Sequence, residues 1–464
     1  MEKFFHIRER GSTVRTEVLA GVTSFMAMAY ILMVNAGIFS DLETVSYGAV
    51  YVATALSAVI GTVLIGLLAN LPLAQASGMG LSAYFVYTVC FGLGLSYANA
   101  LVLVFVDGLV FILLTVTGLR QKIFEAIPKQ VRMAIPAGLG LFLAFVGLQK
   151  SGLIVSNSST CVSMASFNVC SGGVTWAAIM PMLVTFFAFL AIAILSKRGV
   201  RGSVMWGILG GAAAYYLLGF LTIPDFASGI SVTMNPASSF TDFAAQAFGK
   251  VFTEGFDFSS FIEANGTGGF LVMFAATSMA FCVADIFDTF GTLCGACACG
   301  NLLTPDGNVP GMDRAMLAGA IATTAGAICG TSAVTTFAES SAGIADGGRT
   351  GLAAMVTAVL FFAAMFLAPI AGLIPGCATA AALIYVGVLM VGCVRGIDWH
   401  NPESAVPAFL TMTMIPFTCN ISFGIALGLI SFLIIEAFLG KIRCVKPAAW
   451  IMGVLFALTF FLTH

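Results

Sequence analysis

Charged residues are scarce in this chain. Only 9% of its 464 residues are Asp, Glu, Lys or Arg, whereas a soluble domain carries about 25%. Hydrophobic residues make up 59%, so too few polar side chains exist to cover a water-soluble fold. The formal net charge is -2, which offers no basic surface to nucleic acid. The composition therefore predicts a protein that is embedded in a lipid bilayer almost throughout.

The chain also lacks the usual signs of a cofactor or a catalytic centre. Its three histidines are scattered, which argues against a histidine metal site. No Walker-type glycine loop occurs, so ATP is not expected to drive the protein. No GxGD motif occurs either, which disfavours a membrane-embedded aspartyl hydrolase. We therefore expect no metal, no other cofactor and no enzymatic activity.

Apolar runs of membrane-spanning length recur along the sequence. The first half holds seven, at about 17–39, 47–69, 73–90, 97–118, 133–149, 176–196 and 203–222. The second half holds seven more, at about 268–292, 314–329, 331–346, 350–373, 376–394, 404–418 and 421–439. Residues 1–17 are polar for too long to form a removable signal peptide. A further stretch at 447–463 either crosses the membrane once more or lies at its surface.

These segments predict an all-α polytopic membrane protein with fourteen transmembrane segments in two repeats of seven. The first repeat covers 1–222 and the second 268–440. An external loop region, 223–267, separates them, and 441–464 forms a basic linker with the additional apolar stretch. Because seven is an odd number, the two repeats have opposite topology, as in many secondary transporters.

Basic residues follow the even-numbered segments. Lys129 follows the fourth segment, Arg314 the eighth and Arg395 the twelfth, whereas Lys150 and Lys250 are exceptions. The positive-inside rule therefore predicts a multi-pass protein of the cell (inner) membrane, with these loops and the N-terminus in the cytoplasm.

Cysteine provides no strong motif. Cys294, Cys297 and Cys299 are close together, but no fourth Cys or His accompanies them, and packing in an apolar segment is the favoured interpretation. The external loop after the fifth segment carries Cys161 and Cys170. This pair could form a disulfide or remain as two free thiols, and the sequence favours neither.

The third and tenth segments differ from the others. They read LPLAQASGMGLSAYFVYTV and TSAVTTFAESSAGIADGG, and both are short, rich in small residues and poor in Leu. Each begins with a stretch that can be extended, followed by a Gly- or Ser-rich part that can open a half-helix. Such interrupted segments are tolerated in a membrane only where they are buried in protein or line a cavity. Their occurrence as a pair predicts a transporter with its binding site between them.

Acidic residues within apolar segments are the strongest site candidates, because a carboxylate at that depth is costly. In DIFDTFGTL of the eighth segment, Asp285, Asp288 and Thr289 share a helix face at spacings of three and four. Asp285 is the preferred candidate for substrate contact and for proton coupling, and Asp288 is the second. Thr289 is a further candidate for substrate contact. Either aspartate could instead hydrogen-bond a backbone amide at a helix break. Asp107 in the fourth segment has no assigned role.

The interrupted segments contribute the other candidates. Glu339 and Ser340 are neighbours in the tenth segment. We assign both to substrate binding, and the carboxyl group of Glu339 also to proton coupling. The alternative is a buried Glu that bonds Ser or Thr between the repeats. In the third segment we assign Ser82 and Phe85 to substrate binding, the latter by stacking on a planar ligand. Simple packing of Phe85 is equally open.

The chain resembles a known family at these positions. The pieces FFHIRERGSTVRTEVLAGVTSFMAMAYILMVNAGI, GMGLSAYFVYTV, AIPAGLGLFLAFVGLQ, DIFDTFGTLCG and TSAVTTFAESSAGIADGGRTGLAA are similar to motifs of the nucleobase-ascorbate/NCS2 transporters. The resemblance is closest to the AzgA-like branch of hypoxanthine, guanine and adenine permeases. It places the family's acid of the eighth segment on Asp285 and that of the tenth on Glu339. Ser82 stands where the family usually has Asn, which puts the base preference in doubt.

The resemblance implies a fold and a mechanism. It implies a core domain and a gate domain, with uptake of a purine base coupled to protons through an elevator-like movement of the core. The expected partners are a purine nucleobase and the lipid bilayer, and a homodimer stays open. The nearest alternative is an anion transporter of the same fold, such as a sulfate permease. That alternative would place a neutral or cationic group where Glu339 stands.

Overall fold

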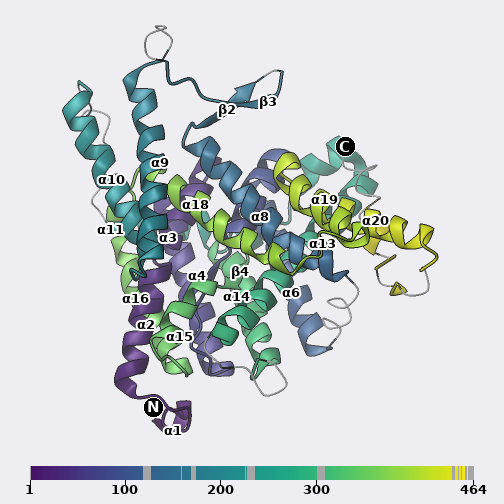
Figure 1. The fold of residues 1–464 in the computed structure, drawn as a ribbon, viewed down its shortest axis with the longest axis horizontal. Coiled ribbons are helices and arrows are strands. Elements are labelled where there is room, and N and C mark those ends of the chain that lie inside the picture. The colour runs from purple at the N-terminus through teal and green to yellow at the C-terminus, as the bar shows by residue number, and fades with distance from the viewer. Residues whose placement is uncertain are drawn as a thin grey trace.

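The structure is a computed structural model in which helices dominate. The described residues are 2–118, 127–157, 159–168, 174–224, 226, 236–299, 302, 309–441, 445–447, 449–450, 452–454 and 457. Figure 1 shows a bundle of helices with the N-terminus at one end and a small β-hairpin, β2–β3, near the other. Most of 447–463 lies outside the described residues, as does Cys170.

The helices begin and end close to the apolar runs in the sequence. The first half contains α1 Glu2–Phe5, α2 Val14–Met28, α3 Tyr30–Phe39, η1 Ser40–Leu42, α4 Tyr47–Leu68, β1 Gln75–Ser77, α5 Met79–Ala83, the π-helical η2 Tyr84–Gly92, α6 Tyr97–Val116, α8 Lys129–Lys150, β2 Ile154–Asn157, β3 Cys161–Met164, α9 Trp176–Lys197 and α10 Ser203–Thr222. The second contains α11 Pro236–Asp242, η5 Phe243–Ala247, α12 Lys250–Thr253, α13 Ser259–Cys299, α14 Met312–Cys329, β4 Val334–Thr336, η6 Ala338–Ser340, α15 Ser341–Ala345, α16 Gly351–Ala364, η7 Met365–Leu367, α17 Ala368–Ala371, α18 Gly376–Val391, η8 Gly392–Gly396, α19 Pro402–Thr418 and α20 Ile421–Phe438.

Polar residues mark where several of these helices start. The side chains of Thr13, Ser46 and Ser96 each accept a hydrogen bond from a backbone N–H of the following first turn. Within lipid the remaining backbone groups of an apolar helix satisfy one another. Local sequence therefore fixes these helices before any packing is considered.

Ten of the described helices are long and apolar enough to cross a membrane, so the chain is a multi-pass membrane protein. The other four predicted segments, 73–90, 314–329, 331–346 and 404–418, fall on elements that are shorter, interrupted or less apolar. The total of fourteen crossings thus stays a prediction. The expectation of an all-α protein needs one correction, because two small antiparallel sheets are present.

Packing separates the long helices into two groups. In the α4–α14 group, α14 packs on α4 and α6, and α16 packs on α2 and α4. In the α8–α18 group, α8 packs on α18 and α19, while α9 packs on α10 and α18. Glycines allow the closest crossings. A Cβ on Gly351 would lie 2.1 Å from the Gly66 carbonyl oxygen, and one on Gly387 would lie 2.4 Å from that of Gly140.

The two interrupted segments meet inside the α4–α14 group. Strand β1 pairs antiparallel with β4, and Ala76 lies opposite Thr335. Each strand is followed by a short helix, α5 after β1 and α15 after η6. This confirms the predicted arrangement of an extended stretch followed by a half-helix. The strands are fully buried, and their pairing satisfies backbone groups that lipid could not.

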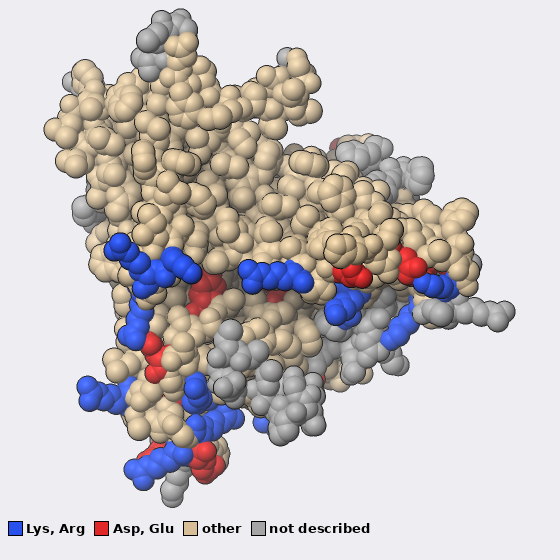
Figure 2. All heavy atoms as spheres, viewed as in Figure 1, with Lys and Arg blue, Asp and Glu red and all other residues tan. Residues whose placement is uncertain are grey.

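Charge is unevenly distributed over the surface. On the face drawn in Figure 2, Lys and Arg are confined to the half nearer the N-terminus, and the half that carries β2 and β3 shows none. The uncharged half exposes large apolar side chains, among them Phe187, Leu217 and Leu221. Such a surface suits lipid contact.

Candidate functional site

A cavity of about 470 Å³ lies between the two helix groups. Its walls are Gly78, Met79, Gly80, Pro136, Leu143, Phe287, Asp288, Gly291, Thr292, Gly295, Thr335, Thr336, Phe337, Ala338, Glu339, Ser341, Val386, Leu389 and Met390. The interrupted segments and α13 form one side, and α8 and α18 form the other. This volume is typical of small-molecule sites.

Two carboxyl groups face this cavity. Asp288 on α13 and Glu339 on η6 are both half-buried, and each lies within electrostatic reach of the other. Thr335 lines the same cavity and lies beside Asp288. The Tyr30 hydroxyl donates to Glu339 Oε1 over 2.7 Å. None of the described residues that line the cavity is Lys, Arg or His.

The rest of the lining is mainly apolar or small. Leu143, Val386 and Met390 lie opposite the acids, on the α8–α18 group. The continuous helix Met79–Gly92 begins at the cavity, and the free N–H groups of a helix N-terminus favour an acceptor atom there. Gly78 is needed for close packing, because a Cβ on it would lie 3.0 Å from the Thr335 hydroxyl. A flat molecule with polar edges and apolar faces suits such a space.

A family model described as "Permease family" (Xan_ur_permease) matches residues 15–427 of the chain. This chain belongs to that permease family. The match covers most of the sequence and includes both interrupted segments. Membership in this nucleobase-ascorbate/NCS2 family indicates a transporter and not an enzyme.

Curated relatives are similar to the permease over its whole length. The guanine/hypoxanthine permease PbuG of Bacillus subtilis is 38% identical over 468 residues, which cover 99% of this chain and 99% of that protein. The adenine permease AdeP of Escherichia coli is 36% identical over 458 residues, which cover 99% of this chain and 95% of that protein.

Solved structures share the fold at much lower identity. The transmembrane domain of the cyanobacterial bicarbonate transporter BicA is 13% identical to this chain, with a TM-score of 0.60. The superposition covers 87% of this chain and 95% of that domain. At this identity the likeness concerns the fold alone.

The structure does not bring Asp285 into the cavity of the permease. Its side chain is fully buried, and it accepts hydrogen bonds from Thr323 over 2.9 Å and from Thr289 over 3.2 Å. Asp285 and Asp288 are three residues apart, but α13 turns only the second toward the cavity. The two acids that line this cavity are therefore Asp288 and Glu339, and substrate contact by Asp285 stays a prediction. Thr289 also lies behind the wall, bonded to Asp285.

Ser82, Phe85 and Ser340 are likewise outside the lining. Phe85 is fully buried and packs on Phe39 and Tyr97. The Ser340 hydroxyl accepts from the backbone N–H of Ala74 over 3.0 Å, and it is the neighbouring Ser341 that reaches the cavity. In this structure these residues hold the interrupted segments in place, and their predicted contact with a ligand stays a prediction.

Ser82 belongs to a buried hydroxyl network that joins the two interrupted segments. Its Oγ lies 2.6 Å from Ser332 Oγ and 3.2 Å from Ser77 Oγ. Thr331 donates to Ser77, and Asn35 donates to Thr331. Buried polar networks of this kind are costly to break once formed.

We expect Ser332→Ala to lower the free energy of unfolding by about 1–3 kcal/mol, because it removes the hydroxyl that bonds both Ser77 and Ser82 in a buried network. Thermal unfolding of the purified permease in detergent would measure the loss. Ser431→Ala, which removes a hydroxyl bonded only to a carbonyl of its own helix, is the control and should change little. An equal effect of both variants would contradict a special role of the network.

Sequence reasoning missed two partners of the cavity acids. Tyr30 was hidden in a continuous apolar run, where an aromatic residue is typical of simple packing. Thr335 was visible beside Glu339, but the pairing of β1 with β4 that directs it to Asp288 is not a local signal. The small residues Gly291 and Gly295, spaced four apart on α13, do mark the cavity face of that helix.

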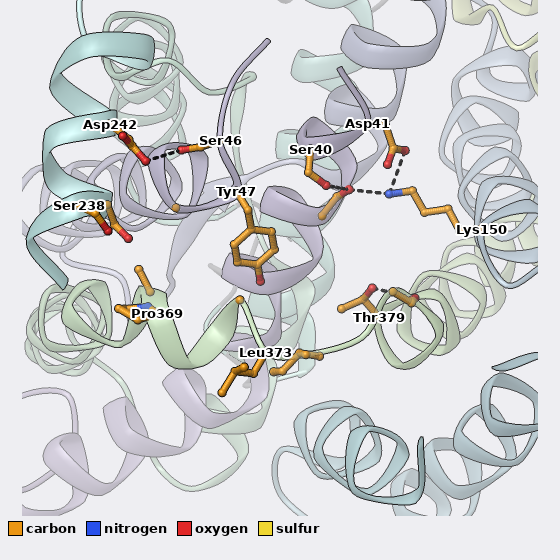
Figure 3. Close-up of a pocket in the computed structure, with 17 residues that line it drawn as sticks. Ser40, Asp41, Ser46, Tyr47, Lys150, Ser238, Asp242, Pro369, Leu373 and Thr379 are labelled. Carbon is orange, nitrogen blue, oxygen red and sulfur yellow. Dashed lines mark hydrogen bonds and ion pairs between the residues drawn. The ribbon is translucent and has the colours of Figure 1, made fainter. Parts of the chain in front are cut away.

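A second cavity, of about 540 Å³, lies near the other end of α8. It is lined by polar residues of η1, α4, α8, α11 and α18, including Ser40, Ser46, Ser238, Asp242 and Thr379 (Figure 3). The Ser46 hydroxyl donates to Asp242 over 3.1 Å.

An ion pair spans the two helix groups at this second cavity. Lys150, at the end of α8, lies 3.0 Å from Asp41 and also donates to the Gly37 carbonyl oxygen (Figure 3). The Tyr87 hydroxyl donates to the same Asp41 over 2.6 Å. We call Lys150, Asp41 and Tyr87 the latch. It ties α8 to the ends of α3 and η2 at the pole remote from the N-terminus.

Proposed function

We propose that the permease imports a purine nucleobase, adenine, guanine or hypoxanthine, together with a proton. The observation that carries this proposal is the pair Asp288 and Glu339 in a cavity that is otherwise apolar or neutral. The names of the curated relatives, which are guanine/hypoxanthine and adenine permeases, support the same substrate class.

The chemistry of a purine matches the lining. A purine base is flat and neutral, and its edge presents N–H donors that carboxylate oxygens accept in charge-assisted hydrogen bonds. Its faces are apolar and fit between the Gly-rich wall of α13 and the aliphatic side chains of α8 and α18. Two acids on neighbouring elements can bind one edge of the ring at two points.

The rival substrate class is a small anion, as transported by proteins of similar fold. Two carboxylates would repel an anion, and the described lining offers no cationic side chain to compensate. The start of helix Met79–Gly92 alone supplies less than a unit charge. The anion alternative is therefore the weaker one.

Orientation and mechanism extend this proposal. The N-terminal pole carries the basic loops and is proposed to face the cytoplasm. The acid-lined cavity lies nearer that pole. Its wall includes Pro136, in the half of α8 that begins at Lys129, and Met390, at the end of α18 that leads to Arg395. The α4–α14 group would act as the core that carries substrate, and the α8–α18 group as the gate. Fourteen crossings in two inverted repeats and an elevator-type displacement of the core complete the proposal.

Uptake of radiolabelled adenine, guanine and hypoxanthine by cells that express the permease tests the function directly. We expect accumulation of at least one base and its collapse when a protonophore is added. Labelled sulfate and bicarbonate serve as the anion arm. Anion uptake without purine uptake would overturn the proposal.

The latch should hold the remote pole closed. We expect Lys150→Met to raise the population that is open on that side by up to about fivefold, because a half-buried ion pair contributes up to about 1 kcal/mol. A cysteine placed at Thr379 in a background with both Cys161→Ser and Cys170→Ser would report this as faster labelling by a membrane-impermeant maleimide.

Lys250→Met is the matched control for the latch, because Lys250 pairs only with Glu254 on the next turn. Labelling should stay at the wild-type rate in that variant. An unchanged rate in Lys150→Met would show that the latch does not determine which pole is open.

A further inference from the structure

Behind the acid-lined cavity, two more carboxyl groups lie together. Asp107 on α6 and Asp285 on α13 are both fully buried and within electrostatic reach of each other. Neither oxygen of Asp107 has an N–H or O–H partner, and only the Cys282 thiol, a weak donor, faces it. A buried carboxylate without a donor or a cation is costly, so this arrangement needs an explanation.

Among the described residues, no positively charged group acts on the pair. Two titratable groups act on Asp107, and both are on α13: Asp285 and Cys282. Helices α14, α12 and η2 also pack on α6, but none of their titratable groups acts on Asp107. Asp285 in turn interacts with Asp288, and Asp288 with Glu339. Ionisation of both acids in this position is costly, and binding of one proton by the pair relieves the repulsion.

A proton fits this site better than a metal cation. In the described part of the chain no group of three or more His, Cys, Asp or Glu could hold a metal ion. Helices α6 and α14 also cross very closely beside the pair. A Cβ on Gly108 would lie 2.3 Å from the Thr324 hydroxyl, so little room exists there for a hydrated ion.

The Thr323 hydroxyl connects the pair to the substrate cavity. It lies 2.9 Å from Asp285 Oδ2 and 3.2 Å from the Val334 carbonyl oxygen, and it accepts from the Val334 N–H over 3.1 Å. A hydroxyl has one hydrogen and can donate to only one of the two acceptors. Val334 begins β4, which leads directly to Thr335 and Glu339 in the cavity.

We propose that Asp107 and Asp285 form the coupling-proton site of the permease, distinct from the acids that bind substrate, and that Thr323 transmits its occupancy to β4. The pair carries one negative charge with the proton and two without it. When Asp285 is ionised, Thr323 donates to it. When Asp285 holds the proton, its O–H donates to Thr323, whose own hydrogen turns to the Val334 carbonyl. This inference rests on the proposed purine–proton symport.

The test uses liposomes that contain the purified permease. It measures two activities separately: exchange of substrate across the membrane, and accumulation of substrate against its concentration gradient. Exchange of radiolabelled hypoxanthine against unlabelled hypoxanthine needs the substrate cavity but no net proton movement. Accumulation against a gradient needs the coupling site. With one proton per base and a gradient of one pH unit, wild type should concentrate hypoxanthine about tenfold.

We expect Asp107→Asn to exchange at a rate close to wild type and to lose the pH-driven accumulation. Glu436→Gln, which alters another buried acid, on α20, should retain both exchange and accumulation. Retained accumulation in Asp107→Asn would overturn the coupling site and leave the proposed function standing. Absence of hypoxanthine exchange in wild type would overturn the proposed function itself, and accumulation driven by sodium alone would overturn the proton assignment.

A second variant and a measurement on wild type cover the case in which Asp107→Asn does not fold. Asp285→Asn should show the same split between exchange and accumulation. Infrared spectra of the wild-type permease should contain the carbonyl band of a protonated, buried carboxyl group at neutral pH, weaker in Asp285→Asn. Absence of that band in wild type would contradict a shared proton.

Discussion

Asp288→Asn is expected to reduce purine uptake by about 10- to 100-fold, because a hydrogen bond to a charged group contributes about 1.5–3 kcal/mol. The amide keeps the size of the side chain but loses the charge that accepts from a ring N–H. Initial uptake rates, with the amount of permease in the membrane quantified, would measure the effect. Equilibrium binding of the same base to the purified variant should weaken by a similar factor.

Two comparisons make the Asp288 result specific. Glu263→Gln alters an exposed acid near the start of α13, before the kink at Gly266, and should leave uptake unchanged. Asp285→Asn should bind the base nearly as tightly as wild type, because Asp285 lies behind the cavity wall and its amide can still accept from Thr323. Loss of binding in Asp285→Asn with full binding in Asp288→Asn would reverse our assignment of the two acids.

Glu339→Gln is expected to reduce net uptake by a factor similar to that of Asp288→Asn, since it removes the second carboxylate of the cavity. Tyr30→Phe should have a smaller effect, a reduction of about 3- to 10-fold, because it removes one donor to Glu339 and leaves the carboxylate in place. A competition series with adenine, guanine and hypoxanthine would show in addition whether the Tyr30 bond sets the base preference.

The order of these two effects is the decisive result. If Glu339 contacts the substrate and Tyr30 orients it, the loss in Glu339→Gln exceeds the loss in Tyr30→Phe. The double variant should then resemble Glu339→Gln alone. A larger loss in Tyr30→Phe would mean that the phenol itself contacts the base.

Comparison of sequence and structure shows which features were local. The long helices could be predicted because each apolar run satisfies its own backbone hydrogen bonds in lipid. The interrupted segments at Gln75–Ser77 and Val334–Thr336 were visible in the same way, through small residues and missing Leu. Their mutual pairing was not, because a strand partner 259 residues away along the chain, as between Ala76 and Thr335, leaves no local mark.

The candidate site was only partly predictable. The sequence identified Glu339 and both aspartates of α13 as buried acids, which follows from their apolar neighbours. It ranked Asp285 above Asp288, in agreement with the resemblance, because residues three apart on one helix face carry no local sign of which one reaches a cavity. It also assigned Ser82 and Phe85 to the ligand, whereas the structure uses them to join and fill the interrupted segments.

The amino-acid sequence by itself determined that this chain enters a membrane, where its helices lie and which few acids are buried there, because these properties depend on the transfer of each segment from water to lipid. The tertiary structure alone decided which acid meets the cavity. Thr323 on α14 binds Asp285 from one side, and the open space beside Gly291 leaves Asp288 facing the other. That choice depends on how α13 is rotated against its neighbours, and packing sets this rotation.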